Sequence, residues 1–163
     1  MHMKSTHLPT AVLILCDIRS MENVGSMLRT ADGVGIEKVY LVGITPLPID
    51  RFGRKVGGIA KTALGAEETV AWEYAQEIDP LLARLSREGY QLIAIEQSES
   101  SVDYKTVQPV RPVAFMVGNE VEGLTTAVLE KADTIAEISL RGEKESLNVS
   151  VAAGVALFRM LDR

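Results

Sequence analysis

The chain has 163 residues, of which 47% are hydrophobic and 24% charged, and its formal net charge at pH 7 is −5. These values are ordinary for one globular domain and argue against disorder, collagen-like repeats and disulfide-linked scaffolds. The single cysteine cannot form an internal disulfide, and no apolar stretch is long enough for a membrane-spanning helix. We therefore expect one cytoplasmic domain over residues 1–163, with residues 1–8 flexible and no membrane contact.

The positions of histidine and the lack of phosphate-binding motifs exclude several common classes of enzyme. Both histidines, His2 and His7, lie at the N-terminus, so the body of the chain offers no histidine for general-base catalysis or for zinc. No P-loop motif is present, and no G-x-G-x-x-G motif follows the first predicted strand. An enzyme built from this chain would use arginine, carboxylate, hydroxyl, amide and backbone groups, and we expect no metal.

Short apolar runs alternate along the chain with segments of helical character. Strands are predicted at residues 8–18, 38–43, 90–95, 113–117 and 134–140, and residues 69–75 are ambiguous. Helices are predicted at about 23–35, 80–88, 125–131 and 146–161, with Asn23, Asp79 and Ser146 as caps of the first, second and fourth. This alternation predicts an α/β domain with a mostly parallel sheet flanked by helices.

Three polar segments follow predicted strands, where ligands of such sheets bind. They are residues 23–31 (NVGSMLRTA), 118–124 (GNEVEGL) and 146–152 (SLNVSVA). Each has an ordinary interpretation when taken alone. Arg29 could pair with Asp32 at the surface, Gly118 could belong to a simple turn, and Ser146 could merely cap a core helix.

One basic segment stands out in this acidic chain. Its four basic residues have no acidic residue among them: Arg51, Arg54, Lys55 and Lys61. Such a run is either a solvated loop or a contact that neutralises RNA phosphates. Separately, the final predicted helix is almost wholly apolar, which fits either a dimer interface or burial within one chain.

Taken together and in this order, the three polar segments resemble the SpoU family of the SPOUT RNA methyltransferases. The family carries N-x-G-x-x-x-R-T-A, G-x-E-x-x-G-L and S-L-N-V-S-x-A segments, and residues 61–66 (KTALGA) and 94–97 (AIEQ) are also similar. The resemblance covers residues 10–162 and departs at Ser139, where the family usually has proline. It implies a SPOUT-type α/β fold with a C-terminal trefoil knot, a homodimer, and here a minimal form without added modules.

The resemblance also implies a chemistry. The cofactor is expected to be S-adenosylmethionine, and the reaction the transfer of its methyl group to a ribose 2′-hydroxyl of tRNA or rRNA. The expected cofactor-binding residues are Gly118, Ile138, Leu140 and Leu147. Arg29 matches the catalytic arginine of the family. The residues expected to position it and the ribose are Asn23, Glu120, Ser146 and Asn148.

Arginine does not readily lose a proton, which limits its expected role. We expect Arg29 to orient the hydroxyl and to neutralise the alkoxide that develops on it. Two other functions remain open from the sequence: a base methyltransferase of the same knotted superfamily, and a non-catalytic RNA-binding protein. The acidic net charge and an aromatic content of only 5% argue against the second of these.

Overall fold

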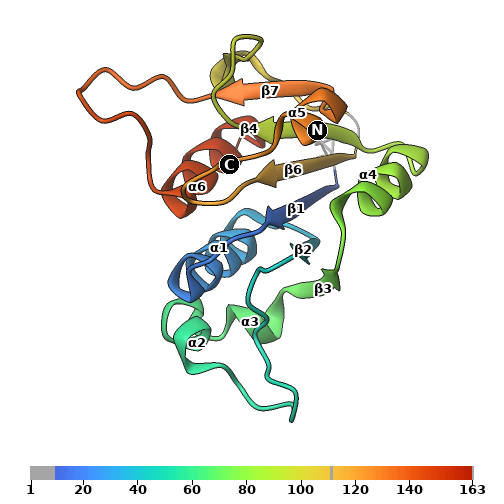
Figure 1. The fold of residues 1–163 in the computed structure, drawn as a ribbon, viewed down its shortest axis with the longest axis vertical. Coiled ribbons are helices and arrows are strands. Elements are labelled where there is room, and N and C mark those ends of the chain that lie inside the picture. Colours follow the sequence, from blue (N-terminus) through green and yellow to red (C-terminus); the bar gives the residue numbers. More distant parts are fainter. Residues whose placement is uncertain (1–9, 111, 163) are drawn as a thin grey trace, which may run out of the picture.

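The computed structural model describes residues 10–110 and 112–162, and these form one seven-stranded parallel sheet with helices around it (Figure 1). The strand order is β3-β2-β1-β6-β4-β7-β5, and every neighbouring pair is parallel. The predicted α/β class is therefore confirmed. The flexibility expected for residues 1–8 concerns a segment outside the described residues.

The elements follow the predicted alternation, with additions. The strands are β1 (Ala11–Cys16), β2 (Lys38–Val42), β3 (Ala71–Ala75), β4 (Gln91–Ile95), β5 (Val102–Asp103), β6 (Val113–Val117) and β7 (Thr134–Glu137). The helices are α1 (Met21–Val34), α2 (Gly57–Ala63), α3 (Ala66–Thr69), α4 (Ile78–Arg87), α5 (Thr126–Lys131) and α6 (Val149–Met160), with a 3-10 turn η1 (Tyr104–Thr106). The ambiguous segment 69–75 thus contains the edge strand β3.

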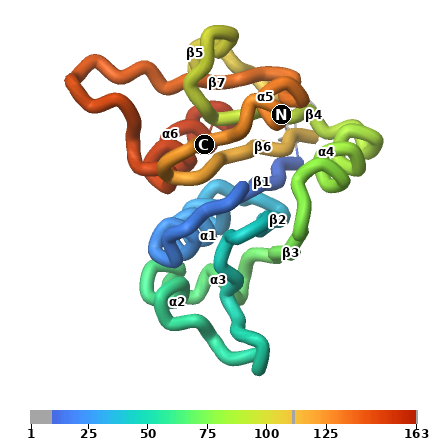
Figure 2. The backbone as a smooth tube through the Cα atoms, in the orientation of Figure 1, coloured from blue at the N-terminus to red at the C-terminus, as the bar shows by residue number. Residues whose placement is uncertain are grey.

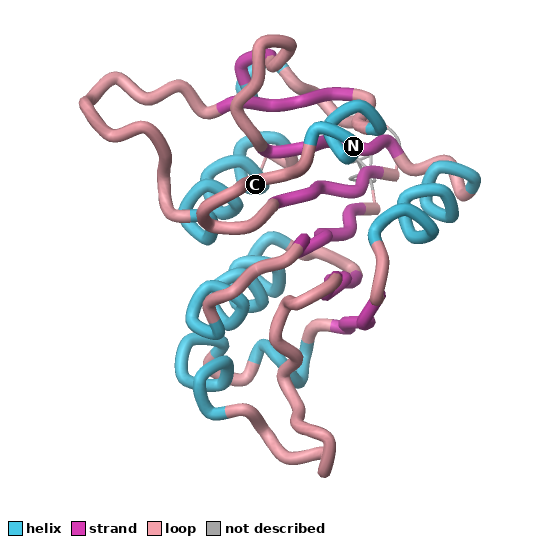
Figure 3. Tube along the Cα trace, in the orientation of Figure 1, coloured by secondary structure: helices cyan, strands magenta, loops and turns pink. Residues whose placement is uncertain are grey.

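Both faces are buried in the central strands such as β1 and β6, because successive side chains of a strand point to opposite faces and helices cover each face. On one face, Leu13 and Phe115 belong to a core that includes α1, α2, α3 and α6. On the other face, Ile14 and Met116 pack with α4 and α5. Figure 3 shows the helices distributed on the two sides of the strands. No helix in the described part of the chain is long and apolar enough to cross a lipid bilayer.

All three helix caps predicted from the sequence are wrong. Helix α1 begins after Ser20, whose hydroxyl oxygen accepts a hydrogen bond from the Asn23 backbone N–H at 3.2 Å. Helix α4 follows Glu77, which makes no side-chain capping bond. Helix α6 follows Asn148, so Ser146 lies outside the helix. Ser20 and Asn148 are also residue types that commonly cap helices, so residue preference alone does not distinguish them from Asn23 and Ser146.

The segment that follows Lys55 and contains Lys61 is helical, which the sequence pattern did not indicate. Helix α2 packs against α1 at Gly25, where an added Cβ would collide with the Thr62 hydroxyl and the Ile59 carbonyl oxygen. The Thr62 hydroxyl donates a hydrogen bond to the Glu22 carbonyl at 2.9 Å. The glycine of the first polar segment therefore allows α1 to hold α2 and the basic loop before it.

Candidate functional site

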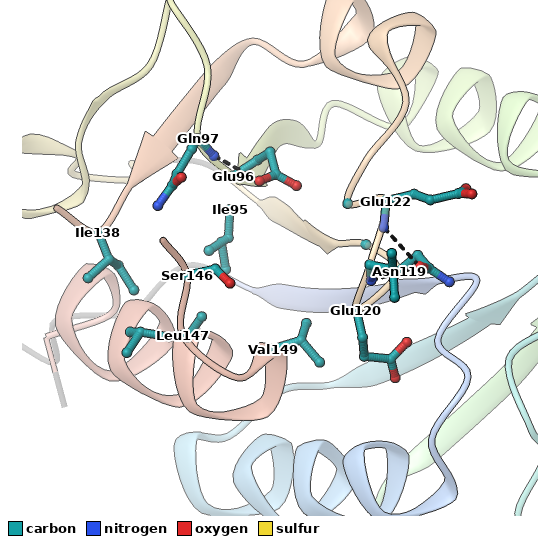
Figure 4. Close-up of a pocket in the computed structure, with 14 residues that line it drawn as sticks. Ile95, Glu96, Gln97, Asn119, Glu120, Glu122, Ile138, Ser146, Leu147 and Val149 are labelled. Carbon is teal, nitrogen blue, oxygen red and sulfur yellow. Dashed lines mark hydrogen bonds between the residues drawn. The ribbon is translucent and has the colours of Figure 1, made fainter. Parts of the chain in front are cut away.

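A cavity of about 210 Å³ opens beyond the carboxyl ends of β4, β6 and β7 (Figure 4). These strands are parallel, so their ends meet at the same edge of the sheet. Apolar residues line the cavity together with the turn of residues 118–123, among them Ile95, Ile138, Leu147, Val149 and Ala152. The arrangement can hold a flat apolar group between side chains and place polar groups against the turn.

The charges around the cavity are all negative. Its lining includes Glu96, Glu120 and Glu122, and no lysine or arginine among the described residues. Such a lining favours a ligand that carries positive charge and disfavours a phosphate. Within the described ranges, no group of three or more His, Cys, Asp or Glu side chains is placed to hold a metal ion.

The turn after β6 depends on two glycines. An added Cβ at Gly118 would collide with the backbone of Gly123 and Leu124, so the turn can fold back only with glycine there. Gly123 has a φ of +67°, and its N–H donates a hydrogen bond to the Asn119 carbonyl at 2.9 Å. Gly118 is therefore required by the packing of the turn itself, in addition to the predicted approach of a ligand to its backbone.

Glu120 connects this turn to the start of α1. Its carboxylate accepts hydrogen bonds from the backbone N–H groups of Arg19 (2.9 Å) and Ser20 (3.0 Å) and from the side-chain amide of Asn23 (3.1 Å). Desolvation by partial burial acts to raise the pKa of Glu120, but these hydrogen bonds outweigh it and the pKa lies below its ordinary value. The carboxylate is therefore ionised at neutral pH, where it also complements the N-terminal dipole of α1.

Asn23 extends the same network to the third polar segment. Its side-chain oxygen accepts a hydrogen bond from the Asn148 amide at 3.2 Å. Asn148 in turn caps α6, because its oxygen accepts the Ser150 backbone N–H at 2.9 Å. One side chain from each polar segment thus forms a chain of contacts, Glu120 to Asn23 to Asn148, beside the cavity.

Two functional candidates come from the 94–97 stretch, to which the sequence assigned no role. The Glu96 carboxylate accepts the backbone N–H groups of Leu124 (3.1 Å) and Gln97 (2.9 Å). The Gln97 side chain donates to the Glu145 carbonyl at 3.0 Å and so anchors the exposed loop of residues 139–148 beside the cavity. The resemblance of residues 94–97 (AIEQ) to the family was the feature of the sequence that could have identified these two residues.

The predicted cofactor-binding residues fall mostly in one place. Gly118, Ile138 and Leu147 line the cavity, together with Glu120 and Ser146 from the second and third polar segments. Leu140 is half-buried and is not among the lining residues, so its predicted contact stays a prediction. Asn23 and Asn148 also lie outside the lining, and they reach it through Glu120.

Arg29 lies apart from this cavity. It is exposed and lines a separate hollow with Lys61, Thr62 and Phe158, between α1, α2 and α6. The ordinary interpretation of an ion pair with Asp32 is not realised in the described part of the chain, where Asp32 accepts the Thr69 hydroxyl at 3.2 Å. Within one chain, Arg29 therefore shares a surface with Lys61 and not with the predicted cofactor-binding residues.

The basic segment is partly neutralised by neighbouring acids. Arg54 pairs with Asp50 at 2.9 Å, and Lys55 pairs with Glu68, also at 2.9 Å, which raises the pKa of Lys55. Neither Arg51 nor Lys61 forms an ion pair with any residue that the structure describes. The charge available to a polyanion is therefore concentrated on fewer residues than the sequence indicates.

A parallel sheet covered on both faces, with a cavity at its carboxyl edge built from three distant segments, defines an α/β ligand-binding domain. The sequence profile of the SpoU rRNA Methylase family matches residues 10–158. The chain belongs to this family, which confirms the resemblance found in its sequence.

Several known proteins are similar to this chain over most of its length. A tRNA (guanosine(18)-2′-O)-methyltransferase of Escherichia coli is 29% identical, with 92% of this chain and 62% of that protein covered. A 23S rRNA (guanosine-2′-O-)-methyltransferase of Ralstonia nicotianae is 34% identical, with 92% and 57% covered. The crystal structure of an AdoMet-bound rRNA methyltransferase from Sinorhizobium meliloti has a TM-score of 0.78 and 28% identity, with 93% and 55% covered. The chain thus spans less than two thirds of the length of these relatives.

Proposed function

We propose that this chain is a cytoplasmic RNA methyltransferase that uses S-adenosylmethionine to methylate a ribose 2′-hydroxyl of tRNA or rRNA. Its family and its relatives, whose names specify 2′-O-methylation of tRNA and of 23S rRNA, support the proposal. The observation that carries it is the convergence of the three polar segments, through Glu120, Asn23 and Asn148, beside one cavity.

The cavity fits the proposed cofactor in both its apolar and its charged parts. Ile138, Leu147 and Val149 can flank an adenine ring, and the surrounding carboxylates attract the sulfonium and ammonium groups. A phosphorylated cofactor would instead be repelled by Glu96 and Glu120. When bound, S-adenosylmethionine supplies an electrophilic methyl group.

The residues of the chain would then position the methyl acceptor. Arg29 stays protonated, so it orients the ribose hydroxyl and stabilises the negative charge that develops on its oxygen. Glu120 and Asn23 act as positioning residues, since they hold the start of α1 against the turn after β6. Ser146, exposed at the cavity, offers a hydroxyl that can hydrogen-bond the ribose.

We propose further that the chain forms a homodimer in which Arg29 serves the cavity of a second copy. The hollow that contains Arg29 includes Phe158 of α6, and Val151 and Val155 of the same helix are 50% and 40% exposed. The start of the helix, at Val149, lines the cofactor cavity. Packing two copies through this apolar face of α6 would bring the hollow of one copy next to the cavity of the other.

The trefoil knot belongs to the same proposal. Strand β7 lies between β4 and β5, so the chain that leaves β5 passes across β7 and β4 to reach β6. The 3-10 turn η1 of this crossing segment packs against α6. A C-terminal segment enclosed between the sheet and such a crossing would be threaded through it.

The substitution Arg29→Ala tests the chemistry. We expect it to abolish methyl transfer and to leave S-adenosylmethionine binding unchanged in calorimetry, because Arg29 lies outside the cavity. Leu147→Arg should instead prevent S-adenosylmethionine binding, and with it methyl transfer, because it adds bulk and positive charge at the cavity. An active Arg29→Ala enzyme would overturn the proposal. Digestion of the labelled product to nucleosides separates ribose methylation from base methylation.

Mixing the two variants tests the dimer. Arg29→Ala and Leu147→Arg subunits are each expected to be inactive alone. A mixed dimer contains one composite site with both an intact Arg29 and an intact cavity if the arginine acts across the interface. Recovered activity supports this arrangement, and its absence in a mixture shown to exchange subunits contradicts it.

A further inference from the structure

The tip of the loop between β2 and α2 carries an exposed aromatic ring between two cations. Figure 2 shows this loop projecting away from the sheet and the helices. Phe52 is 66% exposed, and the guanidinium carbons of Arg51 and Arg54 lie 4.8 and 4.9 Å from the centre of its ring. Both are cation–π distances.

The loop is ordered by its own hydrogen bonds. The Asp50 carboxylate accepts the backbone N–H groups of Phe52 (2.8 Å) and Arg54 (2.9 Å) and also the Arg54 side chain (2.9 Å). The bond from the Arg54 N–H is the main reason that the pKa of Asp50 lies below its ordinary value. Ile49 and Lys55 form a bridge across the base of the loop. A defined turn therefore holds the aromatic ring in solvent.

Phe52 has no evident part in the stability of the domain. It belongs to neither hydrophobic core and is not among the half-buried side chains packed against them. An exposed aromatic ring flanked by arginines is instead the arrangement that stacks on nucleobases, because every base presents a π face and guanidinium planes stack in the same way.

We propose that Phe52, with Arg51 and Arg54, is a stacking site for an unpaired base of the RNA substrate. This inference rests on the proposed function and specifies the substrate: an RNA that presents an unstacked nucleotide, as in a loop or bulge, and not a continuous duplex. Arg51, which forms no ion pair with a described residue, is free to contact the phosphate beside that base.

The stacking site is connected to Arg29 through α2. The loop leads directly into this helix, which packs on α1, and Lys61 of α2 shares the hollow with Arg29. A single strand that stacks on Phe52 and follows α2 would meet Lys61 and then Arg29. The path supplies phosphate contacts between the stacked base and the residue proposed to orient the ribose.

A short RNA hairpin with 2-aminopurine in its loop tests the proposal, with a blunt duplex of the same stem sequence as comparison. Binding is measured by anisotropy and stacking by quenching of the 2-aminopurine fluorescence. We expect Phe52→Leu to weaken hairpin binding roughly tenfold and to remove the quenching, and Phe52→Trp to restore both. The affinity of Phe52→Leu for the duplex should equal that of the wild type. Ile44→Ala, which trims another side chain that is 65% exposed, serves as the matched control.

Three outcomes would overturn the stacking site: unchanged hairpin binding by Phe52→Leu, an equal loss for hairpin and duplex, or a changed oligomeric state in sedimentation. The last would make Phe52 a contact between protein chains. The binding assays require no methyl transfer, so they remain decisive if the enzyme assay fails. Conversely, methyl transfer by the wild type combined with normal binding by Phe52→Leu refutes the stacking site alone.

Discussion

Replacement of Glu120 by glutamine tests the network that joins the polar segments. The carboxylate accepts hydrogen bonds from Arg19, Ser20 and Asn23, and glutamine would present an NH2 group to one of these donors. A hydrogen bond to a charged group contributes about 1.5–3 kcal/mol, and a negative charge at a helix N-terminus about 0.3–1 kcal/mol. Because Glu120 is half-buried, the lower values apply. We expect a loss of about 2 kcal/mol, which lowers Tm by about 4–8 °C.

The loss should depend on pH in a defined direction. The pKa of Glu120 is lower in the folded protein than its ordinary value of about 4.3. The unfolded chain therefore binds this proton more tightly, so the stabilisation is complete above the ordinary pKa and disappears as the pH falls through the lower, folded pKa. Glutamine does not titrate. The difference between the two proteins should be full at neutral pH and shrink in acid.

Urea unfolding followed by circular dichroism, from neutral pH into the acid range, measures this difference. Glu122→Gln is the matched control, because Glu122 lies on the same turn but its carboxylate accepts no hydrogen bond from a described residue. Its effect should stay within about 0.5 kcal/mol. Figure 4 shows the Glu122 side chain pointing away from Glu120. A loss in Glu120→Gln that equals the control, or that persists undiminished in acid, would refute the reasoning.

Three further substitutions follow from contacts in the structure. Gly25→Ala is expected to cost about 3 kcal/mol in thermal unfolding because its Cβ would collide with Thr62 of α2, and an unchanged midpoint would contradict this packing. Gly118→Ala should prevent cofactor binding in calorimetry by displacing the turn after β6, and normal binding would show that the turn tolerates a side chain. Lys61→Gln should reduce the slope of log K against log salt for binding of single-stranded RNA by about 0.7. Lys55→Gln should change this slope less, because Lys55 is already ion-paired with Glu68, and equal changes in the two variants would argue against this distinction.

The strands could be predicted because most of them are apolar runs buried on both faces, as in β1 and β6. The exceptions have identifiable causes. Strand β5 has only two residues, Val102 and Asp103, and both are exposed, so no hydrophobic pattern marks it. Helix α2 begins with two glycines, which disfavour an isolated helix, and it forms where Gly25 lets it pack on α1. These elements depend on tertiary contacts that a single sequence does not contain.

The candidate site was predictable to the extent that its residues follow strands. The second and third polar segments meet at one cavity because parallel strands end at one edge, and the first joins them through Asn23. The direction in which the Arg29 side chain points could also be predicted, from the geometry of an α-helix. It lies six positions after Asn23, and this offset rotates its side chain by about 240° around the helix axis relative to that of Asn23. Helical geometry alone therefore turns Arg29 away from the network. The hydrogen bond from Gln97 to the Glu145 carbonyl, in contrast, joins residues that are far apart in the sequence, so no local pattern could predict it.

The cofactor cavity and the hollow that contains Arg29 carry opposite charges, and this difference affects where S-adenosylmethionine and RNA would bind. The cavity lining carries Glu96, Glu120 and Glu122 without a cation among the described residues, so a phosphate that entered it would meet repulsion. The hollow between α1 and α2 carries Arg29 and Lys61, which attract a phosphate backbone. A cationic cofactor and an RNA strand would therefore bind on different surfaces of one chain. Methyl transfer would require the two surfaces to meet, which is why we propose that a second copy packs on the apolar face of α6 and brings the hollow of one copy to the cavity of the other.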